Sequence, residues 1–259
     1  MNPRSLLPLL FVATLFATGC YETVYGNGIA GFTTQSAPHF DEVEVSGALA
    51  VTVVVTDARL SGLQGWEMSG DANLLPYVSS YVVDGRLVVE SEERLESVTP
   101  LVLTIHSTRF ERLVVSDYAE VDLVDVRRPT LRVDAYDVAE ARVSGEADVM
   151  EVFADDGAEI TLDVIAAAGS VRTEGFSEVV LRGSTTDLFI DAHDSSEVYA
   201  GSLASSIVTV DAWDNAEADV CAWDLLDAAV LGTSTVRSLC AASVVRAEVS
   251  DAATLVDVQ

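Results

Sequence analysis

The chain has 259 residues, and its 42 acidic residues against 14 basic ones give a formal net charge of −28. Every basic residue is an arginine, because the sequence contains no lysine. Nucleic-acid binding requires a basic face, so this composition argues against it, and it also disfavours adsorption to anionic lipid. The length suffices for one large domain with a substantial core.

The first 19 residues have the pattern of a secretory signal peptide. Arg4 supplies a short positive region, residues 6–16 are mostly apolar, and the segment closes at residues 17–20 with Ala-Thr-Gly-Cys. This ending resembles a bacterial lipobox, which implies that Cys20 becomes the new N-terminus and carries a membrane-tethering lipid. Tyr21 stands where an aspartate would resemble an inner-membrane retention signal, so the outer membrane is the expected location. An ordinary signal peptide cleaved nearby is the alternative.

Two regions precede the repetitive part of the chain. Residues 20–36 are rich in Gly, Thr and Ser and are expected to form a tether. Residues 37–110 are rich in alternating apolar residues, and Asp84-Gly85 between two apolar runs predicts a two-residue hairpin turn. We expect this region to form irregular opening coils, or a sheet packed on them, that cover one end of the fold.

From residue 111 to residue 259 the sequence repeats every 19 or 20 residues, which is typical of a solenoid. Each repeat places an Asp or Gly three positions before a marker residue and a small Ala or Ser one position before it. Apolar residues alternate on both sides of this turn signal, which predicts two short strands per coil joined by a tight corner. The marker residues of the eight coils are Glu120, Glu140, Glu159, Glu178, Glu197, Glu217, Thr235 and Thr254. The pattern predicts an all-β fold, a parallel β-helix whose equivalent side chains stack in rows.

Residues 40–47, 70–78 and 83–87, together with the later repeats, resemble a bacterial family called putative auto-transporter adhesin, head GIN domain. The resemblance covers residues 37–259. It implies a right-handed parallel β-helix that is secreted or lipid-anchored and acts in adhesion, with no catalytic residues to transfer. One departure is clear, because the corner glycine of the family is Asp in most repeats of this chain.

Cys221 and Cys240 are 19 residues apart, which is one repeat. Each follows an expected inward residue, Val220 or Leu239, so both thiols are expected to point outward on neighbouring coils. The stacking distance lies within the Cα separation of a disulfide, and the compartment is oxidising. We predict a disulfide between coils, with two free thiols as the alternative.

Stacked acidic rows suggest a metal site. Like charges placed this closely repel, and bound Ca²⁺ would relieve the repulsion. The hypothesis is that Asp137, Glu140, Asp156 and Glu159 share a calcium ion. A solvated acidic face screened by salt is the alternative.

Four positions before the marker residues, the side chains are expected to point outward beside the corner. We call these five residues the candidate row: Tyr136, Asp155, Glu174, His193 and Trp213. Aromatic rings interleaved with acids suit the stacking and hydrogen bonding of a glycan. Aromatic side chains that simply lie over the coil are the alternative.

Catalysis finds little support, because His39, His106 and His193 lie in different segments without metal-ligand spacing. Carboxylates one or two coils apart fall near glycosidase separations, but any acidic row produces such distances. The expected function is a non-enzymatic envelope binding or adhesion module that recognises a glycan or an envelope protein. A scaffold without a ligand and a glycan-degrading enzyme are the alternatives. The last coil has no evident cap, so end-to-end homo-oligomers are also expected.

Overall fold

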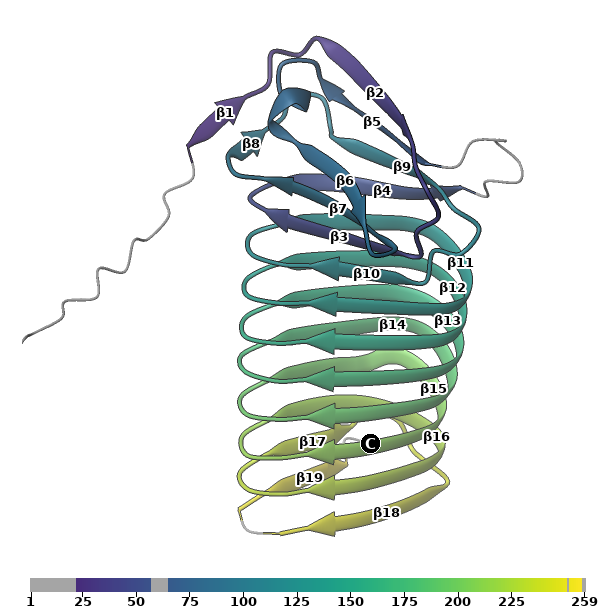
Figure 1. The fold of residues 1–259 in the computed structure, drawn as a ribbon. Helices are drawn as coiled ribbons and strands as arrows, with labels where there is room; N and C mark the ends of the chain where they lie inside the picture. The colour runs from purple at the N-terminus through teal and green to yellow at the C-terminus, as the bar shows by residue number, and fades with distance from the viewer. Residues whose placement is uncertain (1–21, 57–64, 251, 258–259) are drawn as a thin grey trace, which may run out of the picture.

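The computed structural model describes residues 22–56, 65–250 and 252–257, and the predicted signal peptide and Cys20 lie outside these ranges. The fold is all-β and forms a β-solenoid of about eight turns (Figure 1). Six long strands make up its middle: β11 (Glu120–Ala135), β12 (Glu140–Ala154), β13 (Glu159–Thr173), β14 (Glu178–Ala192), β15 (Glu197–Ala212) and β16 (Glu217–Val230). Within the described ranges, no helix is long and apolar enough to span a membrane.

Each long strand makes most of one coil. It starts at the corner, runs along one face, bends, and returns along the other face to the next corner (Figure 1). Neighbouring coils pair in parallel, and their register brings each marker glutamate beside the next, as in Glu120 opposite Glu140. The bend uses left-handed residues, among them Asp125 with φ 51° and Gly183 with φ 108°. The predicted repeat and its register are therefore confirmed.

The corner is a left-handed turn in every long coil. Its residues are Asp117, Asp137, Asp156, Gly175, Asp194, Asp214 and Gly232, with φ between 61° and 72°. Asp and Gly are among the few residues that adopt this conformation readily, which explains why the repeat requires them. The small residue two positions later is buried in each coil, and where it is serine its hydroxyl donates to a backbone carbonyl, as Ser177 does to Glu174 at 2.8 Å.

The core is a stack of inward rows that continues from the first coils to the last. The rows just before the corner contain Leu113, Val133, Val171 and Ile190, all with no exposed surface. The row just after the marker residues contains Val121, Ile160, Val179 and Val198, which are at most 1% exposed. Branched aliphatic side chains suit such a pleated wall, because they pack against the same residue of the next coil.

The solenoid continues into the first half of the chain, but not in sequence order. A coil made by β3 (Glu42–Gly47) and β4 (Ala50–Thr56) stacks directly on β10 (Arg112–Val115) and β11. A further coil, made by β7 (Arg86–Ser91) and β9 (Val102–His106), stacks on the other side of β3 and β4. The chain thus builds one coil, adds another beyond it, and returns to start the regular repeats.

Antiparallel strands cover this end (Figure 1). β5 (Gly65–Asp71) pairs with β9, β2 (Ala30–Ser36) pairs with β5, and β6 (Ser79–Val83) pairs with β7 through the predicted hairpin at Asp84-Gly85. Both turn residues have positive φ, 50° and 81°. A short 3₁₀ helix (Leu75–Tyr77) and the pair of β1 (Thr23–Tyr25) with β8 (Arg94–Glu96) complete the cap. Residues 37–110 thus form both coils of the solenoid and a sheet that covers its end.

The expected tether over residues 20–36 is wrong for most of its length, because β1 and β2 belong to the cap. The glycines serve close packing rather than flexibility. A Cβ built on Gly26 would lie 2.0 Å from the Asp71 carboxylate, and one on Gly31 would lie 2.8 Å from the Ala72 Cα. Glycine is needed where backbone and neighbouring groups approach this closely.

The far end of the solenoid consists of β17 (Thr235–Ser238), β18 (Val244–Val249) and β19 (Thr254–Asp257). A disulfide joins Cys221 and Cys240 there, with their Cα atoms 4.8 Å apart. Val220 is buried as expected, but the expected directions of two other side chains are wrong, because Cys221 is only 5% exposed and Leu239 is 41% exposed. Val220, Cys221 and Ala222 are buried in succession, so the strict alternation assumed from the sequence breaks at this bend.

Candidate functional site

The structure places the five residues of the candidate row side by side, one on each coil. The backbone N–H of each residue donates to a carbonyl of the preceding coil, at distances of 2.9–3.1 Å. The N–H of Tyr136 donates to Val115, for example, and that of Trp213 to Ala192. Trp213 is exposed, and the other four residues are half-buried. The shared row is therefore present as the repeat predicts.

Two aromatic pairs lie along this row. The rings of His193 and Trp213 are parallel within 4°, with centroids 6.2 Å apart. Tyr136 packs against Phe153 with centroids 5.6 Å apart and a tilt of 60°. Tyr136 thus lies over the coil, as the alternative interpretation holds, whereas Trp213 keeps 42% of its surface exposed. The open aromatic surface is at the Trp213 end of the row.

A second outward row, missed by the sequence analysis, provides the polar partners. It stands two residues before the candidate row in each coil and includes Asp134, Phe153, Arg172, Asp191 and Asp211. The period-two alternation of a strand was the signal that could have found it. Arg172 donates to Glu174 at 2.5 Å, and His193 Nε2 lies 2.7 Å from Asp191 Oδ1. Burial and the neighbouring Asp191 and Asp227 raise the pKa of Asp211.

The other end of the same face is fixed by a charge network. Asp134 has no exposed surface and accepts from Arg112 at 2.5 Å and from Arg132 at 2.9 Å. Beside it, a hollow of about 150 Å³ is bordered by Arg132, Phe153, Ser170 and Arg172, among others. The face as a whole combines aromatic rings, cationic donors and carboxylate acceptors.

The glutamate row forms a separate feature on the face after the corner. The Arg142 guanidinium forms an ion pair with Glu140, and its Nη1 lies 3.6 Å from Asp122 Oδ1. Nη2 of Arg237 lies 3.5 Å from Glu217 Oε2. The Tyr199 hydroxyl donates to Glu197, which together with burial raises the pKa of Tyr199 to about 12. Burial and the charges of Glu159 and Glu197 raise the pKa of Glu178.

The expected calcium ligands are not gathered into a site. Across the part of the chain that the structure describes, no group of three or more His, Cys, Asp or Glu residues is arranged to hold a metal ion. Asp137 instead accepts from the Asp117 N–H at 3.2 Å, and Glu140 is paired with Arg142. The hypothesis that Asp137, Glu140, Asp156 and Glu159 share calcium is therefore not supported by the geometry.

We expect Glu178→Gln to raise the melting temperature at pH 7 by about 1–2 °C, because it removes like-charge repulsion within the row. Folding raises the pKa of Glu178, so its ionised form lowers the stability of the folded protein at pH values above that pKa. Below the ordinary glutamate pKa of 4.5 the side chain is protonated in both states, and the substitution then brings no gain in melting temperature. Thermal unfolding of both proteins at pH 7 and pH 3.5 measures the effect. Glu217→Gln is the control, because Glu217 is near Arg237 and its removal brings no gain. An equal shift at both pH values would contradict this account.

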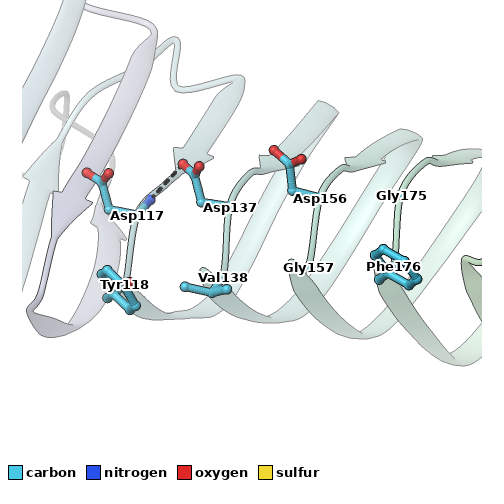
Figure 2. Close-up of a pocket in the computed structure, with 8 residues that line it drawn as sticks. All are labelled: Asp117, Tyr118, Asp137, Val138, Asp156, Gly157, Gly175 and Phe176. Atoms are coloured by element: carbon cyan, nitrogen blue, oxygen red, sulfur yellow. Dashed lines mark hydrogen bonds between the residues drawn. The ribbon is translucent and has the colours of Figure 1, made fainter. Parts of the chain in front are cut away.

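A groove along the corner is the feature that the sequence analysis missed entirely. The residue after each corner residue points outward, and in four successive coils these residues are Tyr118, Val138, Gly157 and Phe176. Figure 2 shows Tyr118, Val138 and Phe176 on one side of the corner, with the carboxylates of Asp117, Asp137 and Asp156 on the other. Together with Gly175 these residues line a groove of about 580 Å³, here called the corner groove.

The corner aspartates also make backbone contacts between coils. The N–H of Gly47 donates to Asp117 at 3.1 Å, that of Asp117 donates to Asp137 at 3.2 Å (Figure 2), and that of Gly175 donates to Asp194 at 3.2 Å. The carboxylates of Asp117, Asp137 and Asp194 thus accept from the corner of the preceding coil, which a glycine at the same position does not do.

A family model described as putative auto-transporter adhesin, head GIN domain, matches residues 39–242, which is more than half of the chain. The fold is similar to that of a solved putative adhesin from Parabacteroides merdae ATCC 43184, with a TM-score of 0.76, 16% identity, and coverage of 92% of this chain and 100% of that one. A putative lipid binding protein from Parabacteroides distasonis ATCC 8503 gives a TM-score of 0.77 at 13% identity with the same coverage. At these identities the similarity shows the fold alone. No curated protein matches the sequence.

Proposed function

Because the chain belongs to the family of putative auto-transporter adhesins, head GIN domain, we propose that it is a non-enzymatic binding module of the cell envelope. Its ligand is a glycan, held on the face that carries the candidate row. The observation that carries this proposal is the parallel pair of His193 and Trp213 with Asp191 and Asp211 next to it. The structural relatives are named as adhesins or as a lipid binding protein, which fits a binding role.

The chemistry of this face matches a sugar. A pyranose has an apolar side that packs on an aromatic ring, and hydroxyl groups that both donate and accept hydrogen bonds. The face supplies the exposed Trp213 ring, the donors of Arg172 and His193, and the carboxylates of Asp191 and Asp211. Donors and acceptors side by side can therefore serve neighbouring hydroxyl groups of one ligand.

The proposal includes the cellular location of the protein. Lipid attachment at Cys20 would anchor the solenoid to the outer membrane, on the periplasmic or the outer side, and leave its faces open to envelope partners. The cap strand β1 begins three residues after Cys20, at Thr23, so the solenoid would stand close to the membrane rather than on a long tether.

Glycan-array binding of the full-length protein tests the proposal. We expect Trp213→Ala to weaken binding of any captured glycan by at least about tenfold, because it removes the exposed ring. Trp223→Ala is the matched control, since Trp223 is 55% exposed but lies at the bend of β16, away from the row. Equal binding by both variants, or no glycan bound by the unmodified protein, would refute the proposal.

A further inference from the structure

We propose that the corner groove is a second binding site, for a polypeptide segment in which lysine or arginine side chains accompany apolar ones. The site differs in place and in ligand class from the glycan face. It is formed where the two faces of the solenoid meet, over the coils that contain residues 117–176.

The groove exposes apolar side chains in a line. Tyr118 is 61% exposed, Val138 53% and Phe176 80%. The equivalent positions of the later coils carry Ser195, Asn215, Thr233 and the small Ala252 instead, so the large apolar residues are confined to the coils next to the cap. Gly157 stands between Val138 and Phe176 and leaves the line open there (Figure 2). A contiguous exposed apolar patch with a polar rim is typical of an interaction site.

Carboxylates border this line on both sides. Asp117, Asp137 and Asp156 line the corner groove itself. A neighbouring hollow of about 760 Å³ shares Tyr118 and Val138 with it. Among the described residues, the wall of this hollow includes Glu120, Glu140, Glu159 and Glu96 but only one cation, Arg94. Arg142 offsets the charge of Glu140, and the remaining carboxylates leave a strong excess of negative charge. Charge complementarity therefore favours a cationic partner.

Hydrogen-bonding capacity separates a basic peptide from a glycan at this site. An ionised carboxylate only accepts hydrogen bonds, whereas lysine and arginine side chains only donate them. A sugar hydroxyl both donates and accepts hydrogen bonds. A wall composed largely of acceptors therefore leaves the acceptor sites of the hydroxyl without donors. The backbone N–H groups that donate to Asp117 and Asp137 hold these carboxylates in place, and each carboxylate has further acceptor sites.

The dimensions suit a short extended segment. Tyr118 and Phe176 are three coil steps apart, which is about 14 Å at the spacing of neighbouring strands. About four residues of extended chain cover this distance. The partner thus needs only a short stretch with two apolar side chains and basic residues among them.

Fluorescence anisotropy with three labelled nonapeptides tests the proposal on the full-length protein at 150 mM salt. The first peptide alternates lysine with valine or phenylalanine, the second has glutamate for each lysine, and the third has serine for each apolar residue. We expect the first to bind at least about tenfold more tightly than either of the others. Equal binding of the first and third peptides would overturn the proposal, because charge attraction alone would then explain it.

Protein variants locate the site. We expect the double substitution Tyr118→Ser and Phe176→Ser to weaken binding of the first peptide at least tenfold, with an unchanged circular dichroism spectrum because both side chains are exposed. Trp213→Ala should leave peptide binding unchanged, whereas the double variant should keep glycan binding, so each proposal fails independently of the other. Peptide binding that survives the double substitution, or that is lost in Trp213→Ala, would overturn the corner site.

Discussion

Leu162→Ala is expected to lower the free energy of unfolding by about 3–4 kcal/mol, the cost of deleting a large buried side chain and leaving a cavity. Leu162 has no exposed surface and lies between Val143 of the preceding coil and Leu181 of the following one. Both neighbours are themselves held by the next coils, so the wall has little freedom to collapse into the cavity. Urea unfolding at 25 °C, followed by circular dichroism, measures the change.

Thr161→Ala is the matched control for this substitution. Thr161 is adjacent to Leu162 in β13, but its side chain points to the outer face and is half-buried. A surface change of this kind costs about 0.5 kcal/mol or less. A Leu162→Ala cost below about 1 kcal/mol would show that the inner row is not closely packed, and a similar cost for both variants would contradict the assigned register.

The repeat could be predicted from the sequence because one local pattern recurs with a nearly fixed period. Once the corner residue and the small residue of one coil are recognised, the register of the next coil follows, and with it the glutamate row and the candidate row. The corner residue, the small residue and the alternating apolar residues recur together over eight coils, and this agreement predicts a parallel β-helix. The candidate row was predictable for the same reason, since Tyr136 and Trp213 occupy one slot.

The cap was not predictable in the same way. β7 and β9 stack on β3 and β4 although they follow them in the chain, and this pairing joins residues more than 40 positions apart without any repeat signal. The contacts of the candidate row were also hidden, because Arg172, Phe153 and Asp191 vary in type from coil to coil. Periodicity identifies shared backbone geometry, whereas the chemistry of each outward position is set coil by coil.

Asp137→Val is expected to lower the free energy of unfolding by about 2 kcal/mol. Asp137 has φ 62°, a left-handed conformation that a β-branched residue adopts only with strain of about 1–2 kcal/mol. The substitution also removes the acceptor of the Asp117 N–H. Asp137→Asn should stay within about 0.5 kcal/mol, because asparagine tolerates the same conformation and retains a side-chain oxygen.

Asp137→Gly separates the two contributions of the corner aspartate. Glycine removes the conformational strain but also removes the carboxylate, so its effect reports the balance between backbone freedom and the bond to the preceding coil. Urea unfolding of the Val, Asn and Gly variants gives the three values under one set of conditions. A Val variant as stable as the Asn variant would contradict the left-handed corner. A Gly variant less stable than the Asn variant would show that the hydrogen bond between coils outweighs the strain, which gives a physical reason for aspartate rather than glycine at Asp137.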